Sequence, residues 1–323
     1  MVFYSALLKI LPMIKILEQL VNIDSPSGYE ERIRDYVSGL IKKYGFHPEI
    51  DNLGNLYVRG ESDLWFVTHL DTVERKADFR LDGEYAYGTG VADAKGSMAS
   101  ILGAMEATDR LGLNFAFLVD EEEGGSGSKH FSENFSGRAV VMEPTNLSVA
   151  EKQLGSAEVV LKFYGKPVHG AYWNEGVNAI EKAIEAIIEL KSKYMFSVQE
   201  LKGGSNLYAI PDLCEVRLSF IFDFDVDMFE MRNELESLDA DVEFSEFYEP
   251  IRCDEIPEIE KYAGKRSVMH SWTDAYNFKK NGWKVTIWGP GNLVDCHTDR
   301  ERIKLDEIEK AAEIILKINE EVV

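Results

Sequence analysis

Several short apolar segments of this sequence end in side chains that commonly bind metal ions. The segment LWFVTHLD ends with His69 and Asp71, and AVVMEPT contains Glu143. In YGTGVADAKG, Asp93 stands between glycines just before a predicted helix, and in GPGNLVDCHTD, His297 follows a glycine-rich turn. Imidazole and carboxylate ligands together suit zinc, cobalt or manganese. These residues therefore predict a divalent-metal site.

Four consecutive acids, Asp120 to Glu123, follow the apolar segment NFAFLV. Adjacent carboxylates repel one another, and a single acid at a strand end is usually a cap or a solvated loop residue. Open α/β sheets bind ligands at the carboxyl ends of their strands, so metal-type side chains at several such ends favour one shared site. A pair of bound divalent cations would also neutralise the acid run.

The apolar segments predict an α/β fold for the first and last parts of the chain. Short runs (NLYVRG, DLWFVTHL, FAFLVD, RAVVMEP) alternate with helical stretches such as the one from Lys95 to about Asp109. This alternation is typical of a mainly parallel sheet that is flanked by helices on both faces. After Pro250 the pattern resumes, with a last helix from about Lys304.

A different pattern occupies the middle of the chain. Strand-like segments and amphipathic helices follow one another as AEVVLKFYG, GVNAIEKAIEAIIELKSKY, 196–201, LCEVRLSFIF, 226–238 and ADVEFSEF. The order β-α-β-β-α-β is the split βαβ pattern of a ferredoxin-like α+β domain. We therefore predict a metal-binding α/β domain formed by residues 1–154 and 251–323, interrupted by an inserted small domain at 155–250.

The composition limits the classes of partner. The 323 residues are 45% hydrophobic and carry a formal charge of -22, so nucleic acid and membrane surfaces are poor partners. The three cysteines have no paired spacing, which fits a reducing compartment. Apolar residues of the first 21 positions recur at helical spacing, which favours an amphipathic helix of a cytoplasmic protein over a signal peptide.

The motifs THLDTV, GTGVADAKGSMAS, DEEEGGSGS, MEPT and HTDRERI, taken together, resemble a known enzyme family. They are similar in type and order to those of the zinc-dependent family of acetylornithine deacetylase, succinyl-diaminopimelate desuccinylase and glutamate carboxypeptidase. The resemblance extends over nearly the whole chain. It implies amide hydrolysis at two divalent metal ions, zinc or cobalt, with manganese also suited to the ligands. The inserted domain matches the lid, or dimerisation, domain of the family.

The resemblance implies a role for each strand-end residue. Asp93 would bridge the two metal ions, and the peptide that follows it is cis in the family. His69 and Glu143 would complete one metal site. Glu122 and His297 would complete the other.

Within the acid run, the resemblance implies that Glu121 is the general base and that Glu122 is a ligand. A register shifted by one residue, to Glu122 and Glu123, is the alternative. Asp71, two residues after His69, would orient that imidazole from outside the metal shell. The alternative is that Asp71 is an acidic residue of a turn with no role at the metal site.

Lid and substrate residues are also implied. His169, in GKPVHGA, would stabilise the developing oxyanion. Many members have a substrate-binding asparagine and arginine at the positions that are Tyr208 and Ile221 here. Asn206 and Arg217 are nearby substitutes, and Arg217 shares a strand face with Ile221 by alternation. A structural role for Arg217 is equally compatible with the pattern.

The segments SPSGYE, DNLGN, TDAYN and GPGNLVDCHT are most similar to one branch of the family, the hydrolases that release lysine or ornithine from an amino-group carrier protein. Some members of this branch are described as acetyl-lysine deacetylases. The resemblance implies that Thr273, Asp274, Gly289 and Gly291 line the substrate site. An acidic protein suits a cationic amine. Carrier proteins of that pathway are acidic too, so docking one would require a local basic patch.

Three hypotheses follow. The first is a two-metal amidohydrolase that removes an acetyl or carrier-glutamyl group from lysine or ornithine in amino-acid biosynthesis. The second is a dipeptidase or carboxypeptidase acting at the same site. The third is a non-catalytic relative, which the presence of Glu121 and all five ligand positions disfavours. An exposed sheet edge in the lid would also allow a homodimer.

Overall fold

The computed structural model describes residues 2–323, and side chains from residue 12 onward. It divides into two compact units. The first comprises the chain up to Lys152, Arg252–Met269 and Thr273–Val323, and the second comprises Gln153–Ile251 and His270–Trp272. The main boundaries lie within two residues of the predicted ones. The assignment of residues 270–272 to the second unit was not predicted.

A six-stranded sheet forms the centre of the first unit, in the order β1-β2-β6-β3-β7-β15. Strands β6, β3, β7 and β15 run parallel, and β1 and β2 pair antiparallel at one edge. Their bounds are β1 Glu49–Ile50, β2 Leu56–Val58, β3 Leu64–His69, β6 Asn114–Leu118, β7 Arg138–Val141 and β15 Lys284–Ile287. Every residue of β3 and β6 is buried, as expected of strands covered on both faces. The predicted mainly parallel α/β fold is confirmed.

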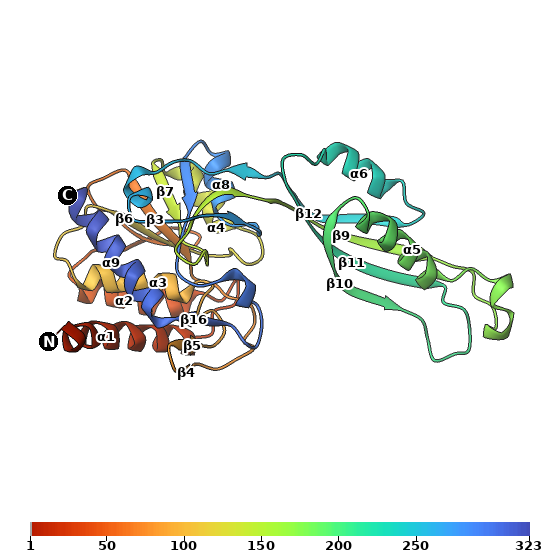
Figure 1. Cartoon of the computed structure of the whole chain (residues 1–323), viewed down its shortest axis with the longest axis horizontal. Helices are drawn as coiled ribbons and strands as arrows, with labels where there is room; N and C mark the ends of the chain where they lie inside the picture. The colour runs from red at the N-terminus through yellow and green to blue at the C-terminus, as the bar shows by residue number, and fades with distance from the viewer. Residues whose placement is uncertain (1) are drawn as a thin grey trace. The chain divides into compact units, whose positions relative to one another are not determined.

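Helices cover both faces of this sheet (Figure 1). One face carries α1 Val2–Asn22, α2 Glu31–Lys43, α3 Lys95–Glu106 and α9 Leu305–Glu321, whose described apolar side chains join one large core. The other carries α4 Ser126–Asn134 and α8 Ala275–Lys280. On that face an aromatic cluster packs edge to face, formed by Tyr57, Trp65, Phe131, Phe278 and Trp283.

Short elements that the sequence pattern did not predict surround the sheet. Two small three-stranded sheets have the orders β13-β8-β14 and β16-β5-β4. These elements are β4 Arg80–Asp82, β5 Tyr85–Tyr87, β8 Val149–Gln153, β13 Ile251–Arg252, α7 Pro257–Glu260, β14 Arg266–Met269, η2 Leu293–Asp295 and β16 Arg302–Lys304. Within residues 2–323, none of the helices combines the length and apolarity required to cross a membrane.

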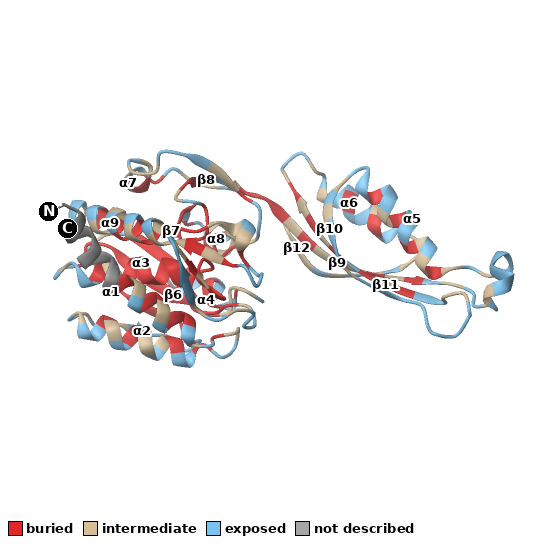
Figure 2. Ribbon diagram, turned by 60° about the horizontal axis from the view of Figure 1, so that its bottom comes forward, coloured by how far each residue is buried: buried red, intermediate tan, exposed pale blue. Residues whose placement is uncertain are grey.

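The second unit is a four-stranded antiparallel sheet in the order β10-β11-β9-β12. Its elements are β9 Gly155–Tyr164, η1 Gly170–Glu175, α5 Ala179–Lys191, β10 Met195–Gly203, β11 Leu213–Phe222, α6 Met228–Glu236 and β12 Asp241–Tyr248. Buried and more exposed residues alternate along β9 and β11, so one face packs under α5 and α6 (Figure 2). The predicted ferredoxin-like order of elements is present.

Gly127 lies where α4 begins beside the end of β6, and the chain packs too closely there for a side chain. A Cβ at this position would lie 2.2 Å from the Val119 carbonyl oxygen and 2.7 Å from the Asn55 Oδ1. The backbone would have to shift. Because α4 follows the acid run directly, such a shift would disturb the placement of Glu121 and Glu122.

We therefore expect Gly127→Ala to lower the free energy of unfolding by about 1–3 kcal/mol, the usual cost of overpacking, and to lower activity. Gly39→Ala is the matched control, because nothing lies within 4 Å of its Cβ on the exposed side of α2. That change should raise stability by about 0.5–1 kcal/mol. Chemical denaturation of both variants tests the comparison, and equal stabilities would contradict it.

Candidate metal centre

The residues predicted as ligands meet because their strands are neighbours. His69 is the last residue of β3, Glu121 and Glu122 follow β6, and Glu143 follows β7. Since β6, β3 and β7 are adjacent and parallel, their carboxyl ends lie at one edge of the sheet. Asp93 reaches the same edge from the loop before α3.

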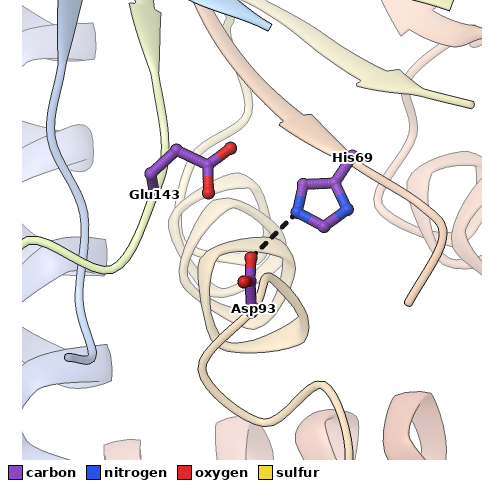
Figure 3. Close-up of side chains that lie close together, drawn as sticks. All are labelled: His69, Asp93 and Glu143. Atoms are coloured by element: carbon purple, nitrogen blue, oxygen red, sulfur yellow. Dashed lines mark hydrogen bonds and ion pairs between the residues drawn. The ribbon is translucent and has the colours of Figure 1, made fainter. Parts of the chain in front are cut away.

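Two groups of potential metal ligands form at this edge. One contains His69, Asp93 and Glu143, and the other contains Asp93, Glu122 and His297; within each group the ligand atoms lie within 4.8 Å of one another. Figure 3 shows the first group, with the Glu143 carboxylate and the His69 ring turned toward Asp93. The structure thus brings together all five predicted ligand residues.

Asp93 belongs to both groups through different oxygen atoms. Its Oδ1 lies 3.1 Å from Nε2 of His69, and its Oδ2 lies 3.5 Å from Nε2 of His297. Nε2 of His297 also lies 3.0 Å from Oε2 of Glu122. A carboxylate that faces one group with each oxygen has the arrangement needed to bridge two cations. The peptide bond Asp93–Ala94 is cis.

Asp71 supports this arrangement in a way that differs in detail from the expectation. Nδ1 of His69 lies 3.0 Å from the backbone carbonyl oxygen of Asp71 and 3.5 Å from its carboxylate. Donation from Nδ1 to the carbonyl leaves the Nε2 lone pair directed at the centre. The carboxylate instead accepts the backbone N–H groups of Glu121 and Glu122, at 3.1 and 3.0 Å, and the Ser27 hydroxyl at 2.7 Å.

The four acids of the run have different roles. Asp120 has a φ of 64°, which turns the chain, and its carboxylate accepts the N–H and hydroxyl of Ser126 at the start of α4. Glu122 faces His297, whereas Glu121 lies among the charges of His69 and Glu143. Glu123 is exposed. The run therefore holds one turn residue, two residues of the site and one solvated acid.

The charges of the site are unbalanced without cations. Burial raises the pKa of the Glu121 and Glu143 carboxyls well above the usual range, and neighbouring acids raise it further. Among the described residues, the buried Oε1 atoms of Glu122 and Glu143 have no hydrogen-bond partner. Buried carboxylate oxygens without partners are costly unless a cation binds them. This donor set of imidazoles and carboxylates fits a pair of divalent ions.

The remaining predicted residues fall into two sets. Thr273 and Asp274 are buried just before α8, and the Asp274 charge acts on both Glu121 and Glu143. A Cβ on Gly289 would lie 2.7 Å from the Glu143 carbonyl oxygen, and one on Gly291 would lie 3.0 Å from Cβ of Ala92. These four therefore lie beside the ligand loops. The other predicted residues, His169, Asn206 and Arg217, belong to the second unit.

Sequence reasoning missed two buried residues that hold the acid run. Glu30 accepts the backbone N–H of Asp120 at 3.2 Å. Asn55, which is fully buried, accepts the N–H of Val119 at 3.0 Å and donates to the Gly127 carbonyl. Both ends of the loop are thus fixed. The signal was present in SPSGYE and DNLGN, but a polar residue near glycine usually indicates only a turn.

Comparison with known proteins agrees with this geometry. Residues 65–321 match the model of peptidase family M20/M25/M40. The chain belongs to this family. It is therefore a hydrolase of the metal-dependent kind that cleaves amide bonds, and the site described above contains its candidate ligands.

Individual relatives align with more than 90% of the chain. A LysW-lysine/LysW-ornithine hydrolase from Sulfurisphaera tokodaii is 26% identical over 91% of this chain and 91% of its own length. A tripeptidase from Staphylococcus aureus has a TM-score of 0.79 at 19% identity, covering 96% of this chain and 97% of its own. A dinuclear metal-binding peptidase from Bacillus subtilis has a TM-score of 0.67 at 13% identity, covering 97% and 99%. Both of these solved structures have the same fold as this chain.

Metal binding should release protons from this chain. Hydrogen bonds that His297 donates to the carboxylates of Asp93 and Glu122 raise its pKa to about 10, so the metal-free imidazole is protonated at neutral pH. A metal ligand must be the neutral imidazole, and the pKa of Glu143 is also raised. The apparent affinity for Zn²⁺ should therefore rise with pH up to about pH 10, where the free His297 imidazole loses its proton.

Calorimetric titration in buffers with different ionisation enthalpies measures this release directly. His297→Ala provides the comparison, because it should release fewer protons and bind the second ion weakly. Equal proton release by the two proteins, or an affinity independent of pH, would contradict the expectation.

Proposed function

We propose that this chain is a two-metal amidohydrolase that releases L-lysine or L-ornithine by cleaving an N-acyl bond to one of its amino groups. The acyl group is acetyl or the terminal glutamyl of a carrier protein. The observation that carries the proposal is the pair of three-residue ligand groups sharing Asp93, with the Glu121 carboxylate beside them. This arrangement is what hydrolysis of an unactivated amide requires: polarisation of the carbonyl and a base for the attacking water.

The chain's own residues divide the chemistry between them. Bound cations, zinc or cobalt in our proposal, would supply Lewis acidity and lower the pKa of water. Glu121 is part of neither ligand group, so its carboxylate is available to take a proton from water and return it to the leaving nitrogen. The Asp71 carboxylate accepts the backbone N–H of Glu121 at 3.1 Å and so holds the backbone of Glu121 in place.

His169 supports the proposal from the lid domain. Its Nδ1 accepts the backbone N–H of Ala171 at 3.2 Å, so a neutral ring carries its proton on Nε2. An Nε2–H donor is the group needed to stabilise an oxyanion. We propose that this histidine donates to the substrate carbonyl oxygen during the reaction.

The amino-acid specificity is inferred from charge and from relatives. A formal charge of -22 favours a substrate that carries a cationic amine. The hydrolase from S. tokodaii, and a second from Saccharolobus islandicus that is 26% identical over 91% of this chain, carry names stating that they act on LysW-linked lysine and ornithine. We propose that the chain acts in amino-acid biosynthesis in the cytoplasm.

We further propose that Thr273, Asp274, Gly289 and Gly291 line the part of the site that holds the substrate, because they lie beside the ligand loops. Arg217 is exposed on β11, on the same face as Ile221. We propose Arg217, with Asn206, as the group that binds the substrate carboxylate in place of the usual residues.

Docking of an acidic carrier would require basic residues that remain free. Several lysines of the second unit instead pair with acids, for example Lys182 with Asp239 at 2.5 Å and Lys202 with Glu200 at 2.7 Å. Such pairs reduce the attraction of this surface for an acidic protein. They favour the small-molecule version of the proposal over the carrier version.

A panel of substrates tests the function. Protein loaded with Zn²⁺ or Co²⁺ should release lysine or ornithine from acetyl-lysine, acetyl-ornithine or a carrier-linked γ-glutamyl-lysine, faster than it cleaves dipeptides and tripeptides. Cleavage of the carrier-linked substrate alone would assign the carrier version. Faster turnover of the peptides would contradict the proposal and make the chain a peptidase, as the tripeptidase fold allows.

Two variants distinguish the role of Glu121 from that of Glu123, another acid of the same run. Glu121→Gln should lower kcat by about 10²- to 10⁴-fold, the usual contribution of a general base, while leaving the number of bound ions unchanged. Glu123→Gln removes an adjacent but exposed carboxylate and should leave kcat within about twofold. If Glu123→Gln were the inactive variant, the register shifted by one residue would be correct.

We also propose a homodimer through the lid domain. Strand β10 is an edge of its sheet, so one row of its backbone groups is unpaired. Large apolar side chains are exposed along β10 and α5, namely Ile184, Ile188, Met195, Val198 and Leu201. An unpaired edge next to exposed apolar side chains is suited to pairing with a second copy about a twofold axis.

Light scattering during gel filtration should therefore report a dimer. Ile188, 65% exposed on α5, is the residue to change, and Ile188→Asp together with Val198→Asp should give a monomer. Phe229→Asp places the same charge on a 75% exposed side chain of α6 and should leave the dimer intact. A monomeric wild-type protein at micromolar concentration would rule out this assembly.

A further inference from the structure

A buried carboxylate four residues beyond His297 contacts the loop that carries Asp93. Glu301 is 1% exposed. Ionisable side chains are seldom buried so deeply unless they are paired or hydrogen bonded. Glu301 lies in the HTDRE segment, between the short helix η2 and β16.

The partners of Glu301 are backbone N–H groups of a single loop. Oε2 accepts from Gly90 at 2.9 Å, while Oε1 accepts from Ala92 at 3.0 Å and from Asp93 at 3.2 Å. The backbone carbonyl of Glu301 accepts the N–H of Gly88 at 3.2 Å. Successive N–H groups that converge on one anion form a nest. Here the anion is a side chain of the protein.

The loop depends on this acceptor for its shape. Gly90 has a φ of 78°, in the left-handed region, and residues 88–95 are all buried. Without the Glu301 carboxylate, the N–H groups of Gly90, Ala92 and Asp93 would have to find other acceptors in the interior. Buried backbone donors are almost always paired, so the loop would change conformation instead. Asp93 would move with it.

We propose that Glu301 is a positioning residue for the metal pair. This role depends on the two-metal site of the proposed function. By holding the N–H of Asp93, Glu301 sets the carboxylate of that residue so that Oδ1 faces His69 and Oδ2 faces His297. Both of its own oxygens are already used by backbone donors, so Glu301 is not itself a ligand. The same short segment thus supplies His297 and fixes the residue shared by both ions.

Glu301→Gln is the sharpest variant because it keeps the size of the side chain. The amide oxygen can still accept from Ala92 and Asp93, but the amide NH₂ then faces the N–H of Gly90, and two donors repel. We expect the affinity for Co²⁺ to fall about 10- to 100-fold, as is usual when a partner of a metal ligand is removed. The visible absorption of the bound Co²⁺ should change, and kcat should fall more than KM rises.

Two further variants separate positioning from general stability. Asp227→Ala removes another carboxylate that accepts backbone N–H groups, from Phe229 and Glu230, but it lies at the start of α6 in the second unit. It should lower the melting temperature without changing Co²⁺ affinity or spectrum. Glu301→Asp retains the charge with a shorter reach, and it should bind Co²⁺ with an affinity between those of the wild type and Glu301→Gln.

The outcomes are distinct. Wild-type affinity and an unchanged spectrum in Glu301→Gln would overturn the proposal. Loss of folding in both Glu301 variants would also overturn it, because Glu301 would then serve the domain as a whole. If the wild-type protein itself failed to bind two Co²⁺ ions, the proposed function would fail first and the role of Glu301 with it. Weaker binding by folded Glu301→Gln, with Asp227→Ala unaffected, would support the positioning role.

Discussion

The site is governed by the repulsion among carboxylates gathered at one edge of the sheet. Asp71, Asp93, Glu122 and Glu143 are buried there or nearly so, and Glu121 and Asp274 lie beside them. Two imidazoles do not balance that much negative charge. Burial raises the pKa of Glu121 and Glu143 because little solvent reaches their carboxyls to stabilise the charged forms. Bound cations would resolve the conflict, and the fold keeps the acids together where two divalent ions would fit.

The acids around the site divide into those that face the centre and those that hold the backbone. Asp71, Glu30 and Glu301 each accept N–H groups from loops that carry site residues. These loops have little regular structure, so their N–H groups have no ladder partners and need side-chain acceptors. Part of the acidic surplus of the sequence therefore serves to shape loops. A count of carboxylates alone overestimates the number of ligands.

Much of the fold could be predicted because burial leaves a strong pattern. Strands β3 and β6 are buried on both faces and appear as continuous apolar runs. The inserted domain was predicted from the order of its strands and amphipathic helices. Strands such as β4, three exposed residues, leave no such pattern and were missed. Helix α3 ends at Glu106, slightly before the predicted end near Asp109.

The ligand residues could be predicted from their strand ends, but apart from Asp71 the residues that support them could not. Glu301 contacts residues more than 200 positions away, and Asn55 contacts Gly127, which is 72 positions away. A polar residue in a loop gives no indication of which distant N–H group it meets. The lid residues proposed to bind the substrate are subject to the same difficulty, because Asn206 lies in the loop between β10 and β11.

The position of the inserted domain separates the two ligand groups along the chain. His69, Asp93 and Glu143 all precede the second unit, whereas His297 follows it. During synthesis, a growing chain holds every ligand of the first group before any residue of the insert has emerged from the ribosome. The second group must wait for nearly the whole polypeptide. The two proposed cation sites would therefore acquire their full sets of ligands at different times, and the first would meet the metal ions of the cell earlier.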